Sequence, residues 1–227
     1  MKRVCIVCEG QTEETFVRDV LAPAFYDLGL NLIPEMVETS PGHKGGALKY
    51  DRVKRHLRNT LRQNSAPVVT TLFDLYRLDS GFPGFDASRA QPDLPRRLEV
   101  LKQSLHADVV AEAGCQPGRF IPYIQPYEFE ALLFSDVSVL IQVNPSWSKK
   151  SIERLVEIRA AAESPEHIND RPETKPAAHL ERELNNPSYR KRRHGPIAAQ
   201  KIGLAKIEAE CAFFAAWLAQ IRELAQP

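Results

Sequence analysis

The chain has 227 residues, of which 43% are hydrophobic and 26% are charged, and its formal net charge is +1. This composition supports a full hydrophobic core and excludes global disorder, while the balanced charge gives no overall signal for nucleic acid. No apolar run approaches the roughly 20 residues of a membrane helix, so we expect no membrane contact. The sequence enters its first strand directly, so we expect no signal peptide and a cytoplasmic protein with reduced cysteines.

Strands and helices are expected to alternate through the first half of the chain. Four runs have the apolar composition of strands: 4–8, 31–37, 67–74 and 120–125. Three segments carry apolar residues at helical spacing: 12–28, 48–63 and 95–113. Pro23 is expected to kink the first helix. The alternation predicts an α/β fold with a mostly parallel sheet of four or slightly more strands, flanked by helices.

The second half of the chain is more polar and predominantly helical. Helical segments are expected at 149–162, at 177–184 and from 196 to the end. A proline-rich, charged stretch at 164–176 separates the first two of them. We therefore predict an α/β core over 1–145 and a helical C-terminal extension over 146–227 that packs on this core.

Carboxylates follow three of the predicted strands. Glu9 ends the first strand, Asp74 ends the third, and Glu128 and Glu130 come just after the fourth. In a parallel sheet, ligands bind outside the carboxyl ends of the strands. If these strands are neighbours, the four carboxylates face one crevice, where they repel each other unless a cation such as Mg²⁺ or Mn²⁺ holds them.

Each carboxylate also has an ordinary structural explanation. Glu13 and Glu14 lie in a first helical turn, where negative charge is favoured by roughly 0.3–1 kcal/mol. Glu9 or Asp74 could serve a turn, and the later pair could be exposed charges that begin a short helix. The joint placement at three strand ends is what favours a metal site.

Several stretches together indicate a family. They are "VCEGQTEETFV" at 7–17, "LFDLYRLDSGFPG" at 72–84, "IQPYEFEALLFSD" at 124–136 and "GPIAAQKIGLAKIEAEC" at 195–211. Their order resembles the bacterial family called domain of unknown function 4276, over nearly the whole chain. The E-G-x-T-E opening also resembles the Toprim-like domain of overcoming-lysogenization-defect-type nucleases. The resemblance implies a Toprim-like fold.

The resemblance to Toprim domains implies Mg²⁺-dependent phosphodiester chemistry. These domains use a glutamate after strand one and a D-x-D pair after strand three, which places catalytic metal ligands at Glu9 and Asp74. In the related nucleases a second glutamate also binds metal, and that position is Glu13. They use a late lysine as well, for which Lys175 is the candidate.

One position departs from the Toprim pattern. The second aspartate of the D-x-D pair falls on Tyr76, whose phenol is neutral near pH 7 and is a poor Mg²⁺ ligand. Asp79, Glu128 or Glu130 would have to replace it. If none does, the chain keeps the fold without the reaction.

Two basic clusters are candidates for phosphate contacts. The nucleic-acid-binding candidates are Lys44, Lys49, Lys54, Arg55, Arg58, Arg62, Arg190, Arg192 and Arg193. Lys54, Arg58 and Arg62 recur every four residues and therefore share one helical face. A solvated polar face is the ordinary interpretation of such spacing, and a salt-sensitive phosphate-binding stripe is the alternative.

The sequence thus favours a metal-dependent nuclease, with a role in bacterial defence or DNA maintenance implied by the resemblance. Family members are often encoded beside an ATPase, so the resemblance also implies an ATPase partner. Two alternatives stay open: a catalytically inactive module that binds nucleic acid or the ATPase, and a structural adaptor that uses the apolar C-terminal helix.

Overall fold

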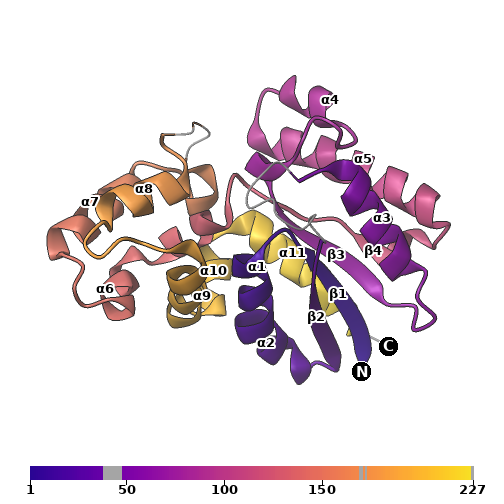
Figure 1. The fold of residues 1–227 in the computed structure, drawn as a ribbon, viewed down its shortest axis with the longest axis horizontal. Coiled ribbons are helices and arrows are strands. Elements are labelled where there is room, and N and C mark those ends of the chain that lie inside the picture. The colour runs from indigo at the N-terminus through magenta and orange to yellow at the C-terminus, as the bar shows by residue number, and fades with distance from the viewer. Residues whose placement is uncertain (38–47, 169–170, 172, 226–227) are drawn as a thin grey trace.

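The computed structural model describes residues 1–37, 48–168, 171 and 173–225, and its centre is a parallel sheet (Figure 1). The strands are β1 (Lys2–Cys8), β2 (Leu30–Met36), β3 (Val68–Asp74), β4 (Phe120–Ile121) and β5 (Ile124–Gln125). Their order is β2-β1-β3-β4, with β5 also paired to β3, and every pairing is parallel. The predicted α/β fold with a mostly parallel sheet is confirmed, and its architecture is consistent with a Toprim-like fold.

The fourth predicted strand is split in two. Pro122 and Tyr123 separate β4 from β5, and both short strands pair with β3. Proline has no N–H to donate to a sheet ladder, which explains the break. The Thr71 hydroxyl bridges it by donating to the Tyr123 carbonyl at 2.7 Å. The segment therefore still delivers residues 126–130 to the carboxyl end of β3.

Helices cover both faces of the sheet (Figure 1). On one face, Cys5 and Val7 of β1 pack in a cluster with α3 (Tyr50–Leu61) and α5 (Leu94–Ala113), and the short α4 (Phe85–Arg89) follows β3 beside them. The other face packs against α1 (Gln11–Phe16), α2 (Ala22–Tyr26) and α11 (Ala212–Glu223). Because both faces are covered, β1 from Val4 onward and all of β3 are buried, as their continuous apolar sequences predicted.

The helix predicted over 12–28 is interrupted rather than simply kinked. A π-helical segment, Val17–Leu21, separates α1 from α2. Pro23 lies in the first turn of α2, where its missing N–H costs no helical hydrogen bond. The irregular turns thus come just before the proline.

The remaining helices form a lobe beside the sheet (Figure 1). They are α6 (Leu140–Val143), α7 (Lys149–Ala160), α8 (Pro176–Glu183), α9 (Lys191–Ile202) and α10 (Leu204–Glu210), preceded by a buried 3₁₀ segment, Phe129–Ser135. None of the described helices is both long and apolar enough to cross a lipid bilayer.

The final helix is part of the cover of the sheet. The Trp217 indole N–H donates to the Thr70 hydroxyl of β3 at 2.8 Å, and the Trp217 ring stacks on Tyr123 with 4.5 Å between centroids. One hydrophobic cluster runs from β1 through this helix into the lobe. The division into 1–145 and 146–227 stays a prediction, with α11 tying the second part to the sheet.

Candidate metal centre

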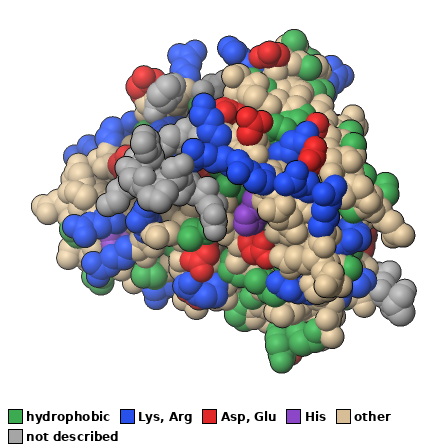
Figure 2. Space-filling view, turned by 45° about the vertical axis from the view of Figure 1, so that its right-hand side comes forward, with side chains coloured by type: hydrophobic (Ala, Val, Ile, Leu, Met, Phe, Trp, Pro, Cys, Tyr) green, Lys and Arg blue, Asp and Glu red, His purple; other side chains and the backbone are tan. Residues whose placement is uncertain are grey.

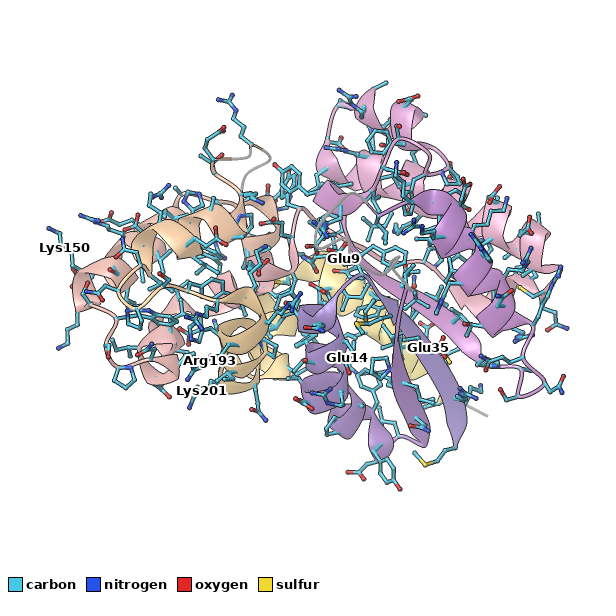
Figure 3. The ribbon with its side chains drawn as sticks, in the orientation of Figure 1. Glu9, Glu14, Glu35, Lys150, Arg193 and Lys201 are labelled. Carbon is cyan, nitrogen blue, oxygen red and sulfur yellow. The ribbon has the colours of Figure 1, made fainter. Side chains whose placement is uncertain are left out.

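Three carboxylates meet at the carboxyl ends of β1 and β3. One oxygen from each of Glu9, Glu13 and Asp74 lies within 4.8 Å of the others. Glu9 follows β1, Asp74 is the last residue of β3, and the strands pair in register up to Cys8 and Leu72. Parallel pairing of neighbouring strands therefore brings Glu9 and Asp74 to one point, and the first turn of α1 adds Glu13. In Figure 3, Glu9 lies at the end of the sheet that borders the helical lobe.

Backbone hydrogen bonds fix two of these side chains. Glu9 Oε2 accepts from the Asp74 N–H at 3.2 Å, and Asp74 Oδ1 accepts from the Phe129 N–H at 2.8 Å. Gly10 makes room for the third, since a Cβ atom there would lie 3.1 Å from Glu13 Oε2. The strand end, the turn and the 3₁₀ segment thus orient the carboxylates before any ligand binds.

The electrostatics of the triad are unfavourable without a cation. Burial and the neighbouring Glu13 raise the pKa of Glu9 to about 8, and burial raises the pKa of Glu13 to about 7. Burial and the charge of Glu9 raise the pKa of Asp74 well above its ordinary value. Near pH 7 the metal-free protein therefore holds protons that a divalent ion would replace.

Glu128 and Glu130 lie beside the triad and are paired with lysines. Glu128 Oε1 is 2.9 Å from Lys175 Nζ, and its Oε2 accepts from the Ala177 N–H at 3.1 Å. Glu130 Oε2 is 3.1 Å from Lys191 Nζ. Among the residues that the structure describes, Glu130 Oε1 has no hydrogen-bond partner although it is buried. Both oxygens of Glu128 are thus occupied, whereas Glu130 keeps one available.

The whole cluster carries an excess of negative charge. It contains Glu9, Glu13, Asp74, Glu128 and Glu130 against Arg77, Lys175 and Lys191. Five carboxylates and three cations leave two negative charges when every group is ionised, which is the charge that one divalent ion neutralises. The donors of the triad are carboxylate oxygens, as Mg²⁺ and Mn²⁺ prefer, and the charge of the neighbouring Glu130 acts on Glu13 and Asp74. These residues fit a hard divalent ion.

A family model described as a domain of unknown function (DUF4276) matches residues 8–222. The chain belongs to this family. No curated protein and no solved structure matches the chain. The DUF4276 match spans every member of the cluster, and its description names no reaction.

Two cations of this DUF4276 site were missing from the residues predicted from sequence. Arg77 Nε lies 3.3 Å from Glu9 Oε1, and Lys191 lies between Glu128 and Glu130. Arg77 could have been recognised in the sequence as a candidate site residue, because it comes three residues after Asp74 at a strand end. Lys191 is one member of a basic run, and nothing in that run marks which side chain turns inward.

Lys191→Met is expected to destabilise the protein. The change leaves Glu130, which is 2% exposed, without its cation, while the lysine itself is 37% exposed. Allowing for that exposure, we expect a loss of about 1–3 kcal/mol in the free energy of unfolding, larger at pH 8 than at pH 6 because Glu130 then ionises unpaired. Urea denaturation at both pH values measures it. Lys201→Met, which changes an exposed lysine on the same helix, is the control. Equal stability of the two variants would contradict a stabilising ion pair between Lys191 and Glu130.

Tyr76 occupies the second aspartate position, and Asp79 is one of the residues that could replace that aspartate; their hydrogen bonds differ. The Tyr76 N–H donates to the Tyr127 carbonyl at 3.1 Å, and the two rings are 5.8 Å apart. Asp79 Oδ1 accepts from the N–H groups of Tyr50, at the start of α3, and of Gly81. Asp79 therefore orders the start of α3 and is not a member of the carboxylate triad.

The basic stripe on α3 faces acids of α5. Lys54 Nζ is 3.0 Å from Asp108 and 3.4 Å from Glu112, and Arg58 is 3.1 Å from Glu112. Arg62 donates to two carbonyls at the end of α5, those of residues 112 and 113. These cations hold two helices together, which weakens the case for a phosphate-binding stripe there.

The other basic candidates occupy varied positions. Lys49 is 3.8 Å from Asp79, and Arg55 is exposed. Lys44 lies outside the described residues. Arg190, Arg192 and Arg193 are exposed at the start of α9, and Figure 3 shows Arg193 on the side of α9 away from Glu9. Lys and Arg side chains are interleaved with Asp and Glu on the face in Figure 2. Phosphate binding by these residues stays a prediction.

Proposed function

We propose that this DUF4276 protein is a divalent-metal-dependent nuclease that hydrolyses phosphodiester bonds in nucleic acid. The observation that carries the proposal is the triad of Glu9, Glu13 and Asp74, which has one oxygen from each side chain within 4.8 Å of the others. A bound Mg²⁺ or Mn²⁺ would polarise a phosphoryl oxygen and activate a water molecule. The resemblance to Toprim-like nucleases, whose metal-binding glutamate and aspartate correspond to Glu9 and Asp74, supports the same chemistry.

The residues of the chain have separate roles in this proposal. Glu9, Glu13 and Asp74 supply the ion-binding oxygens, and Glu130 supplies a further one. Lys175 pairs with Glu128 and Lys191 pairs with Glu130, so the two lysines offset part of the negative charge beside the triad. Burial opposes the charge of Lys191, but the neighbouring carboxylates raise its pKa. The exposed arginines Arg190, Arg192 and Arg193 would contact the nucleic-acid backbone.

Cleavage assays test the proposal directly. Supercoiled plasmid, linear duplex, single-stranded DNA and RNA are each incubated with the protein and Mg²⁺ or Mn²⁺. We expect metal-dependent cleavage that falls at least about 100-fold in Glu9→Gln and in Asp74→Asn, because each removes a charged ligand. Glu14→Gln is the matched control, since Glu14 follows the triad residue Glu13 on α1 but pairs with Arg18. Cleavage that survives both ligand substitutions would sink the proposal.

Tyr76 favours a second candidate function. Tyrosine at the second position of the D-x-D pattern removes a ligand that Toprim catalysis uses, so a module that binds nucleic acid or a partner ATPase without cleaving is the alternative. This alternative predicts DNA binding that weakens steeply with salt and no cleavage of any of the four substrates. If Mn²⁺ binds but nothing is cut, the alternative replaces the nuclease.

A further inference from the structure

Arg77 forms an ion pair with Glu9, one of the three carboxylates of the triad. Its Nε is 3.3 Å from Glu9 Oε1, and the arginine side chain is 44% exposed while that of Glu9 is 8% exposed. The other oxygen of Glu9 accepts from the Asp74 N–H. Arg77 therefore contacts the Glu9 oxygen that does not accept from Asp74, and it does so with a side chain that reaches the protein surface.

The backbone at Arg77 is fixed, but its side chain is long. The Arg77 carbonyl accepts from the Leu48 N–H at 2.7 Å, and Leu75 and Leu78 on either side are buried. A guanidinium on a flexible three-carbon stem can move several ångströms without any change in such a backbone. Motion at this position is thus confined to the charged group that contacts Glu9.

We propose that Arg77 is a displaceable counter-ion: it neutralises Glu9 in the metal-free protein, leaves when a divalent ion binds, and then contacts a phosphate of the substrate. A divalent ion and a guanidinium on the same carboxylate oxygen repel each other strongly in a buried site. Once displaced, the guanidinium stays at the exposed side of the cluster, where it can make charge-assisted hydrogen bonds to phosphate oxygens. This inference rests on the proposed nuclease function and adds a residue that couples metal binding to substrate binding.

The proposal predicts opposite effects of one substitution on two ligands. In Mn²⁺ titrations by calorimetry without nucleic acid, Arg77→Met is expected to bind the ion about 3–10-fold more tightly, because the competing charge is gone. Binding of a fluorescent single-stranded oligonucleotide in Ca²⁺, followed by anisotropy, is expected to weaken about 5–10-fold, because a phosphate contact is lost. Arg77→Lys, which keeps the charge, should fall between the wild type and Arg77→Met in both assays.

Arg18→Met is the matched control, because it removes an arginine from a glutamate on α1 that is not in the triad. It should leave both affinities unchanged. Mn²⁺ affinity that is equal or weaker in Arg77→Met overturns the counter-ion role, even if the nuclease proposal stands. Tighter Mn²⁺ binding with unchanged oligonucleotide affinity overturns the phosphate contact. Absence of Mn²⁺ binding in both the wild type and Arg77→Met overturns this inference together with the proposed function.

Discussion

Asp74→Asn is expected to lower the affinity for Mn²⁺ by at least about 100-fold without loss of the fold. The substitution removes one of three charged ligands, and charge on the ligand set dominates the binding of hard divalent ions. Asparagine has the shape of aspartate and keeps an oxygen at the position that accepts from the Phe129 N–H. The backbone support of the site should therefore survive while the metal site does not.

Metal-free stability provides the second readout for this variant. Asp74 is buried beside Glu9 and Glu13, so the neutral amide relieves repulsion at alkaline pH. We expect equal or greater stability of Asp74→Asn without metal, measured by urea denaturation, and no stabilisation on adding Mn²⁺. Calorimetry gives the affinities, with Glu14→Gln as the variant that should match the wild type. Wild-type Mn²⁺ affinity in Asp74→Asn would mean that the ion binds elsewhere.

The metal-free protein is expected to lose stability as the pH rises from about 5 to 9. Glu9, with a pKa of about 8, and Glu13, with a pKa of about 7, hold protons in the folded state that the unfolded chain releases near 4.5. A carboxyl whose pKa is raised by folding contributes its stability in full below the unfolded pKa, and that contribution disappears as the pH passes through the folded pKa. At 1.36 kcal/mol per pKa unit, the shifts of the Glu9 and Glu13 pKa values from 4.5 to about 8 and about 7 amount to a loss on the order of 8 kcal/mol in total.

A divalent ion should reverse this pH dependence. Because the ion binds only ionised carboxylates, saturating Mn²⁺ stabilises the protein more at pH 8.5 than at pH 6, and its affinity rises with pH in between. Thermal melts at a series of pH values, with and without Mn²⁺, measure both effects. Glu9→Gln should flatten the metal-free curve. A metal-free stability that increases between pH 6 and 8.5 would contradict the protonated state of the triad.

The sequence predicted the part of the site that depends on strand topology. Neighbouring parallel strands end at one edge of a sheet, so two carboxylates at strand ends were enough to predict that Glu9 and Asp74 come together. The apolar runs likewise predicted β1 and β3, because strands covered on both faces have no polar side to place. Pro122 is why the fourth strand became two, although both halves kept the predicted position.

The partners of charged side chains could not be predicted from the sequence. Helical spacing showed that Lys54, Arg58 and Arg62 share a face, but periodicity does not say what lies opposite, and Asp108 and Glu112 of α5 do. In the same way, Glu128 and Glu130 were predicted as metal ligands, and one oxygen of each pairs with Lys175 or Lys191 from the C-terminal half. Such pairs depend on how distant helices pack, which no local pattern records.

The packing of α11 on β3 has a consequence for biosynthesis. Trp217 contacts Thr70 across 147 residues of chain, and Lys2 at the start of β1 donates to the carbonyl of Leu224. While the ribosome is still making the C-terminal half, the part of this face that α11 covers stays exposed to chaperones and to other nascent chains, although α1 and α2 have already been made. Translation must therefore pass α11 before the carboxylate-bearing ends of β1 and β3 are fully supported by the packing on that face.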